Sequence, residues 1–157
     1  MRTLILGAQR IERTLARLAC EVDERNQGTD DLVLFGVIPK GILVAHALSR
    51  HISEIAQRIV TPVPLNLQSS DHKIEDVSGK QVLIVDDVLY TGRTAHQAVA
   101  AVSEMGAPAR IQLMVLIDRG HRELPLRPDY LGRKLQTKYR ERVEVDAEEG
   151  LSVYLIE

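Results

Sequence analysis

Cysteine and aromatic residues are scarce in this chain. Its 157 residues include one cysteine, Cys20, one phenylalanine and no tryptophan. A single cysteine excludes an intramolecular disulfide and a zinc site built from several cysteines, which fits a reducing compartment such as the cytoplasm. With four tyrosines as the other aromatic residues, we expect an aliphatic core rather than a stacking surface for single-stranded nucleic acid.

Long hydrophobic runs and a strong excess of either charge are also missing. The start, "MRTLILGAQR", holds too short an apolar run for a signal peptide, and no stretch approaches the roughly 18 apolar residues of a membrane span. A net charge of −2 and 45% hydrophobic residues exclude a wholly polybasic nucleic-acid binder and a disordered acidic tail. We therefore expect no membrane contact and a single domain over residues 1–157.

The chain alternates between helical and strand patterns. Apolar residues recur at steps of three and four between Ala8 and Arg25, which predicts an amphipathic helix, and further helices are expected at 41–51 and 94–105. Strands buried on both faces are predicted for three continuous apolar runs: "LVLFGV" at 32–37, "QVLIV" at 81–85 and "RIQLMVLID" at 110–118. This alternation predicts an α/β fold with a mainly parallel sheet flanked by helices.

The other segments are less regular. "RIVTPVPLNL" at 58–67 predicts a strand at or near a sheet edge, because Pro62 and Pro64 cannot donate to a ladder. Residues 127–138 are expected to form a loop. "RVEVD" and "LSVYLIE" alternate well enough to predict a hairpin or edge strands near the C-terminus.

Two carboxylates and a polar turn follow the second buried run, in the stretch "VDDVLYTGRT" at 85–94. The carboxyl ends of parallel strands form the ligand crevice, so Asp86 and Asp87 are expected to bind vicinal hydroxyls or to approach a hydrated Mg²⁺. The turn "TGRT" precedes a helix, whose free N–H groups favour an anion, and Gly92 lets the backbone approach it closely. Together these features predict a ligand such as a ribose 5-phosphate.

Three alternative interpretations of the acidic pair compete with this one. An isolated pair of aspartates would more often cap a helix. A Walker B strand is a second alternative, but the P-loop pattern G-x-x-x-x-G-K-[ST] is missing from the sequence. A receiver domain is the third, and it would place its acidic pair after the first strand and a lone aspartate after a later one. The complete string favours the phosphoribosyl site over all three.

The string "VLIVDDVLYTGRT" resembles the phosphoribosyl diphosphate (PRPP) motif of type I phosphoribosyltransferases. With "IQLMVLIDRGHRELPLRPDYLGR", "ERTLARLACEVDERNQG" and "GVIPKGILVAHAL", the chain is similar to one branch, the bifunctional pyrimidine operon attenuation regulators that are also uracil phosphoribosyltransferases. This resemblance implies the type I phosphoribosyltransferase fold with a small C-terminal strand and hood region. It also implies transfer from PRPP to uracil, giving uridine monophosphate (UMP) and pyrophosphate, with Mg²⁺ held mainly by PRPP rather than by protein ligands.

The resemblance assigns roles to individual residues of the site. Asp86 and Asp87 would hold the ribose hydroxyls and stabilise positive charge on the ribose in the transition state. The 5-phosphate would bind at Thr91, Gly92, Arg93 and Thr94, and pyrophosphate at the turn containing Pro39, Lys40 and Gly41. The hood over the base would be "DRGHRELP" at 118–125, with Asp118, Arg119 and His121. From spacing alone, an ordinary polar loop explains that last segment equally well.

The same branch binds messenger RNA through a basic face. The matching positions are Arg17, Arg25, Arg122, Arg127 and Arg133. Residues 118–142 contain eight Lys or Arg against four Asp or Glu in a chain of net negative charge, a pattern that suits the phosphates of a leader stem-loop. Without the resemblance, a solvated loop explains these charges better. The branch also implies a homodimer or higher oligomer.

One segment departs from the branch. Type I enzymes carry a flexible loop that folds over PRPP and excludes water, but "LQSSDHKIEDVSGK" is short and has Ser69 and Ser70 where an aromatic residue and an arginine would fall. His72 and Lys73 are candidates to replace the missing groups. Because a lost lid and arginine can each cost several kcal/mol in the transition state, a nucleotide-sensing RNA-binding regulator without turnover stays open as an alternative. A phosphoribosyltransferase for another base is the other alternative, because the hood segment alone does not define the base.

Overall fold

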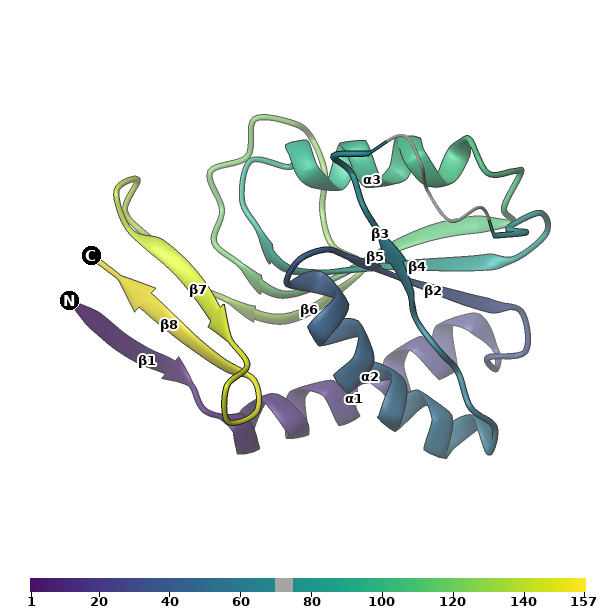
Figure 1. Cartoon of the computed structure of the whole chain (residues 1–157), viewed down its shortest axis with the longest axis horizontal. Helices are drawn as coiled ribbons and strands as arrows, with labels where there is room; N and C mark the ends of the chain where they lie inside the picture. Colours follow the sequence, from purple (N-terminus) through teal and green to yellow (C-terminus); the bar gives the residue numbers. More distant parts are fainter. Residues whose placement is uncertain (70–74) are drawn as a thin grey trace.

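A five-stranded parallel sheet forms the centre of the computed structural model, which describes residues 1–69 and 75–157 (Figure 1). In spatial order its strands are β3 (Val63–Leu65), β2 (Leu32–Val37), β4 (Gln81–Leu89), β5 (Arg110–Asp118) and β6 (Tyr130–Lys134). All four neighbouring pairs are parallel. The predicted α/β fold with a mainly parallel sheet is confirmed, with the acidic-motif strand at its middle and the proline-containing strand at one edge.

Helices cover both faces of this sheet. α1 (Ala8–Asn26) and α2 (Gly41–Ala56) lie on one face and α3 (Arg93–Ser103) on the other (Figure 1). Side chains of β4 alternate between them, because Leu83 and Val85 pack with α1 and α2 while Val82 and Ile84 pack with α3. All four are fully buried, which explains the unbroken apolar run. Within the described part of the chain, no helix is long and apolar enough to span a membrane.

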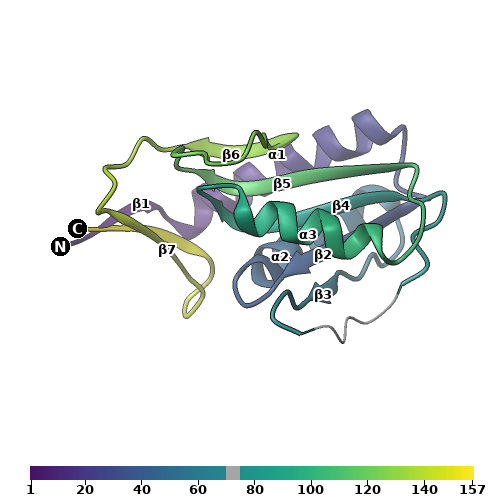
Figure 2. The ribbon, with the colours of Figure 1, turned by 90° about the horizontal axis from the view of Figure 1, so that it is seen from above.

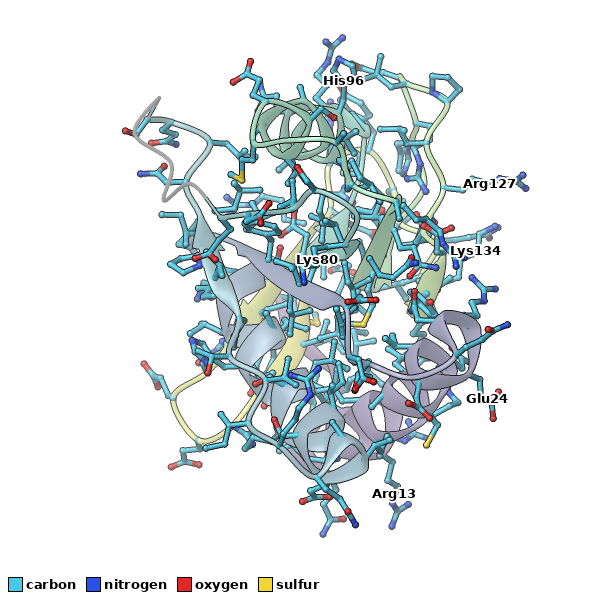
Figure 3. The ribbon with its side chains drawn as sticks, turned by 90° about the vertical axis from the view of Figure 1, so that its right-hand side faces the viewer. Arg13, Glu24, Lys80, His96, Arg127 and Lys134 are labelled. Carbon is cyan, nitrogen blue, oxygen red and sulfur yellow. The ribbon has the colours of Figure 1, made fainter. Side chains whose placement is uncertain are left out.

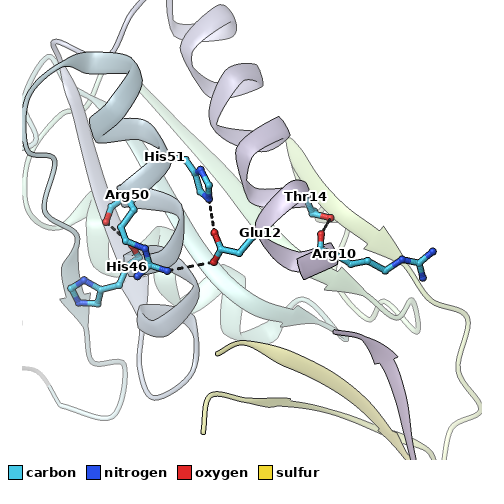
Figure 4. Close-up of polar contacts among 7 residues, drawn as sticks. Arg10, Glu12, Thr14, His46, Arg50 and His51 are labelled. Carbon is cyan, nitrogen blue, oxygen red and sulfur yellow. Dashed lines mark hydrogen bonds and ion pairs between the residues drawn. The ribbon is translucent and has the colours of Figure 1, made fainter. Parts of the chain in front are cut away.

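α1 and α2 pack against each other through an apolar stripe and a polar contact. The α1 residues at the predicted helical spacing are fully buried: Ile11, Leu15, Leu18, Ala19 and Val22. Burial of each larger aliphatic side chain contributes about 1.5–3 kcal/mol. At the edge of the stripe, Glu12 accepts a hydrogen bond from His51 at 2.8 Å and pairs with Arg50 at 3.4 Å (Figure 4). These contacts hold α2, whose first turn borders the site described below.

A second, smaller sheet lies at one end of the molecule (Figures 1 and 2). Its antiparallel strands are ordered β1 (Arg2–Leu6), β8 (Ser152–Ile156) and β7 (Arg142–Asp146). The β7–β8 hairpin confirms the alternation seen in the sequence. Strand β1 was not predicted, because its five residues are too few for a clear strand pattern. It is a strand because it pairs with β8, where Arg2 lies opposite Ile156.

The predicted loop at 127–138 is wrong, because it contains strand β6. This strand adds to the sheet beside β5, with Tyr130 buried. Gly132 permits the close pairing, since a Cβ there would stand 2.4 Å from the carbonyl oxygen of Leu116. Other predicted elements differ at their ends: α2 continues to Ala56 and β4 continues through the acidic pair to Leu89.

Candidate active site

Asp86 and Asp87 lie in the last part of β4, at the carboxyl edge of the parallel sheet. Oδ1 of Asp86 accepts the Asp87 N–H at 2.8 Å, and Oδ1 of Asp87 accepts the Val88 N–H at 2.8 Å. Asp86 is only 9% exposed. Its burial, and then the charge of Asp87, raise the pKa of the Asp86 carboxyl well above its ordinary value. The helix-capping interpretation fails, because Gly92 is the N-cap of α3 and no side chain caps that helix.

The acidic pair borders a cleft of about 810 Å³. This volume suits a small-molecule ligand. Its lining comes from the turn after β2, the segment after β3, the end of β4 and the start of α3. The lining residues are Val37, Ile38, Pro39, Lys40, Asn66, Leu67, Gln68, Asp86, Asp87, Val88, Thr94 and Gln97. The structure thus brings together predicted residues that lie up to 55 positions apart, from Pro39 to Thr94.

The turn after β2 meets the acidic strand at Gly41. Lys40 is the N-cap of α2, and the Ile38–Pro39 peptide bond is cis. A Cβ at position 41 would stand 2.7 Å from the carbonyl oxygen of Val85 and 2.9 Å from Oδ1 of Asp86. Only glycine therefore allows the first turn of α2 to lie against β4. The free N–H groups of that turn point to the cleft end of the helix, where an anion is favoured.

The turn "TGRT" encloses a second hollow of about 110 Å³ next to the first. Its lining includes Asp86, Thr91, Gly92 and Thr94. Gly92 has a φ of 92°, a left-handed conformation that favours glycine. The guanidinium of Arg93 pairs instead with Glu123, with 2.7 Å between Nε and Oε2. Both threonines of the turn therefore border the hollow, the Arg93 N–H donates to Oγ1 of Thr91 at 3.3 Å, and the Arg93 side chain lies outside the lining.

The predicted hood residues surround Tyr90, which precedes the turn. The Arg119 guanidinium lies 3.9 Å from the centre of the Tyr90 ring, and the His121 ring meets the same ring edge-on at 5.5 Å. Arg119 is buried and donates to Oγ1 of Thr137 at 3.1 Å. Asp118 ends β5 beside them. Sequence reasoning missed Tyr90, although an aromatic residue between a buried strand and an anion-binding turn was a usable signal.

Other cleft residues were also missed. Asn66 and Gln68 follow the short edge strand β3, and Gln97 lies in the second turn of α3. The rule that ligands bind at the carboxyl ends of parallel strands could have identified Asn66. The candidates Ser70, His72 and Lys73 lie outside the described residues.

Four of the five arginines predicted to bind RNA belong to the α1 and β6 side of the molecule or to the loop before β6. Arg17 donates to the carbonyls of Leu131 and Gly132, and Arg25 donates to the carbonyl of Asp129 at 2.9 Å. Figure 3 shows Arg127 extending on the same side as Lys134 of β6. The fifth, Arg122, lies within the hood, where it bonds Asp118 at 2.6 Å.

Comparison with known proteins agrees with this geometry. Residues 2–148 match the family model described as "Phosphoribosyl transferase domain". The chain belongs to this phosphoribosyltransferase family, as its PRPP-like motif predicted. Among its curated relatives is the "Bifunctional protein PyrR" of Bacillus mycoides (strain KBAB4), 40% identical over 94% of this chain and 92% of that protein. The protein of the same name from Bacillus cereus (strain B4264) is 39% identical with the same coverage.

Solved structures share the fold. The hypoxanthine phosphoribosyltransferase of Trypanosoma cruzi superposes with a TM-score of 0.79 and 18% identity, covering 98% of this chain and 95% of that one. A hypoxanthine-guanine phosphoribosyltransferase (hpt-2) from Bacillus anthracis gives a TM-score of 0.76 and 20% identity, with 96% of each chain covered. The predicted type I phosphoribosyltransferase fold is confirmed by these superpositions.

Proposed function

We propose that this chain transfers the phosphoribosyl group of PRPP to uracil, giving UMP and pyrophosphate. The observation that carries the proposal is the pair of adjoining hollows, which share Asp86, Val88 and Thr94. One hollow ends at the first turn of α2 and the other at the "TGRT" turn, so anion-binding backbone flanks the carboxylates on both sides. A ribose diol with a 5-phosphate at one end and a diphosphate at the other fits this order of groups.

The proposed reaction is a substitution at C1 of the ribose. The C1–O bond to pyrophosphate breaks, a bond from C1 to a uracil ring nitrogen forms, and the proton of that nitrogen passes to the departing pyrophosphate. Positive charge gathers on the ribose in the transition state. Asp86 and Asp87 would accept hydrogen bonds from the ribose hydroxyls and stabilise this charge electrostatically, and no covalent nucleophile is required.

The carboxylates also fit a magnesium ion that is held mainly by the substrate. Within residues 1–69 and 75–157, no three His, Cys, Asp or Glu side chains gather to bind a metal ion. Asp86 and Asp87 can accept hydrogen bonds from its water ligands. When bound with PRPP, Mg²⁺ would offset the negative charge of the departing pyrophosphate. Lys40, in the same cleft, adds a cation from the chain itself.

We assign recognition of the base to the hood, with Asp118, Arg119 and His121. This assignment is supported by the packing of Arg119 and His121 around Tyr90, which directly precedes the "TGRT" turn. The relatives named PyrR favour a pyrimidine over a purine. A phosphoribosyltransferase for another base is the alternative, and a turnover assay with several bases separates the two.

A nucleotide-sensing regulator without turnover is the second candidate. It is favoured by the alignment with the Bacillus mycoides relative, which spans 165 positions although this chain has 157 residues. The relative therefore carries residues with no counterpart here, as a shortened lid predicts. Loss of a lid reduces water exclusion during transfer while leaving the cleft able to bind.

Turnover decides between the two candidates. UMP formation from uracil, PRPP and Mg²⁺ should be measured for the wild type and for Asp87→Asn, which removes one carboxylate charge from the cleft. If the protein is an enzyme, the wild type should form UMP and Asp87→Asn should form it much more slowly. The range from roughly pH 6 to 9 is the one over which a general acid or base usually titrates. If PRPP or UMP binds but no product forms anywhere in this range, the nucleotide-sensing regulator is the remaining hypothesis.

We also propose that the protein binds a messenger RNA leader stem-loop through the α1 and β6 side. In support, Arg10, Arg13 and Arg133 line a groove of about 380 Å³ between α1 and β6, and Arg17 and Arg25 extend this side along α1. Clustered arginines on one face suit phosphate contacts.

A homodimer or higher oligomer is part of the same proposal. Ile59 is 87% exposed and Ile55 is 38% exposed, both at the C-terminal end of α2 or just beyond it. Burial of such side chains against a second copy would be favourable. Sedimentation at micromolar concentration tests this, and a monomer would contradict it. The compartment expected for the proposed reaction is the cytoplasm, as predicted from the single cysteine.

A further inference from the structure

Arg122 connects the hood (118–125) to the segment before the "TGRT" turn (91–94, the phosphate turn) through hydrogen bonds from its three guanidinium nitrogens. Nε donates to the carbonyl of Leu126 at 2.8 Å, one terminal nitrogen donates to the carbonyl of Tyr90 at 2.8 Å, and the other donates to Oδ2 of Asp118 at 2.6 Å. Its side chain is only 22% exposed. We propose that Arg122 is a positioning residue for the 5-phosphate site, acting through the backbone of the turn.

The hood holds the segment 89–91, which leads into the "TGRT" turn. The N–H of Arg119 donates to the carbonyl of Leu89 at 3.0 Å. The carbonyl of Thr91 accepts the N–H groups of Glu123 at 2.8 Å and Leu124 at 3.1 Å. Arg122 fills the interval between these bonds by holding the carbonyl of Tyr90. Three successive carbonyls before Gly92 are therefore fixed by one loop.

The charge of Arg122 is compensated on the hood side. Burial pushes the pKa of the Asp118 carboxyl up, but hydrogen bonds from Arg122 and from the Gly120 N–H bring that pKa below its ordinary value. The carboxylate therefore stays ionised and keeps the guanidinium in place. Arg122 is not among the residues that line either hollow. Its effect on a bound phosphate is therefore indirect, through the position of the turn.

Lysine cannot reproduce these contacts. A guanidinium is planar and donates in several fixed directions, whereas an ammonium is a compact charge on a flexible stem. Arg122→Lys keeps the charge and the pairing with Asp118, but it loses the simultaneous bonds to the carbonyls of Tyr90 and Leu126. This variant therefore separates the effect of the guanidinium geometry from the effect of the positive charge.

The bonds of Arg122 link the proposed base site to the proposed 5-phosphate site. The residues assigned to the base and the residues assigned to the 5-phosphate share one hydrogen-bonded loop. A change that loosens the hood must therefore also loosen the phosphate turn. The prediction that Arg122 contacts RNA stays a prediction, and such a contact would have to compete with the internal bonds of its guanidinium.

The test uses ribose 5-phosphate, which needs the phosphate turn but carries no base, and it rests on the proposed function. Affinity should be measured by calorimetry for the wild type, Arg122→Ala and Arg122→Lys. Arg110→Ala is the matched control, because Arg110 begins the strand that Asp118 ends. We expect affinity to fall about tenfold in both Arg122 variants, because a displaced turn weakens about one hydrogen bond to the charged phosphate, and to stay unchanged in the control.

A kinetic measurement complements the binding measurement. In the full reaction, kcat/KM should fall about 100-fold in Arg122→Lys, as misplacement of a bound substrate commonly causes, while its melting temperature stays close to that of the wild type. If Arg122→Ala does not fold, Arg122→Lys carries the test alone. Equal ribose 5-phosphate affinity for folded Arg122→Lys and the wild type would overturn the role. If the wild type itself did not bind ribose 5-phosphate, the phosphate site and this role would be lost together.

Discussion

The α-carbon of Gly41 lies so close to Asp86 that a methyl group would stand 2.9 Å from the carboxylate oxygen Oδ1. This contact joins the two walls of the cleft, because Gly41 begins α2 and Asp86 belongs to β4. The spacing between the first turn of α2 and the acidic pair therefore depends on the absence of one side chain.

Gly41→Ala should damage activity more than stability. The new methyl group must push the α2 turn away from β4, which we expect to lower kcat/KM about 100-fold and the free energy of unfolding by about 1–3 kcal/mol. Steady-state kinetics and urea titration measure these effects. Gly7→Ala is the control, because a Cβ at Gly7 meets nothing within 4 Å. Full activity in Gly41→Ala would show that the cleft tolerates a wider spacing.

Asp86→Asn should stabilise the ligand-free protein while it reduces turnover. The raised pKa of the folded Asp86 carboxyl means that its favourable contribution is complete below the unfolded value, near 3.8, and is lost as pH rises through the folded value. At pH 7, above the unfolded value, the Asp86 carboxyl therefore opposes folding, and asparagine removes this effect. We expect the free energy of unfolding to rise by about 1 kcal/mol, with the gain shrinking as pH falls toward 4. Asp30→Asn, at an exposed site, should show neither effect.

Gly92→Val should abolish binding of phosphate-bearing ligands. A valine at a φ of 92° is strained, which we expect to cost about 1–3 kcal/mol, and its branched side chain would crowd Leu124, whose Cβ lies 3.4 Å from the added Cβ. Gly150→Val is closely matched, with a φ of 88° and a neighbouring Cβ, that of Ala8, also at 3.4 Å. Both variants should lose stability, but only Gly92→Val should lose affinity for PRPP or UMP. Equal affinities in the two variants would place the phosphate site elsewhere.

Removal of Arg17 and Arg127 together should weaken binding of an RNA stem-loop and leave PRPP binding intact. Each phosphate contact that is lost should reduce the slope of log affinity against log salt by about 1. A filter-binding series at several salt concentrations measures this slope. Unchanged slopes in Arg17→Ala/Arg127→Ala would remove the proposed RNA surface.

The parts of the fold with a local signal could be predicted from the sequence. Buried runs such as 32–37 and 110–118 became strands with the predicted bounds, because covered parallel strands need apolar residues on both faces. The acidic pair and the turn after it were predicted to lie at the carboxyl edge of a central strand, and they do.

The parts that depend on distant partners could not be predicted. Strand β6 is five residues long and contains Gly132, and it becomes a strand only because β5 offers an edge for it. The same reason explains Arg122, which looks like a surface cation in the sequence. Its burial depends on contacts with Asp118, Tyr90 and Leu126. The hydrophobic periodicity of the sequence does not predict these tertiary contacts.

The pairing of β1 with β8 sets an order of events during synthesis. β1 leaves the ribosome before β8, so the small sheet cannot close until β8 has emerged, whereas the five parallel strands are complete once Lys134 has emerged. Pairings between distant segments form slowly because they close a long loop. Thr137 and Glu141, which hold Arg119, lie between β6 and β7 on the way to that last sheet. A nascent chain should therefore complete the sheet edge that carries Asp86 and Asp87 before the bonds that hold Arg119 in the hood can form.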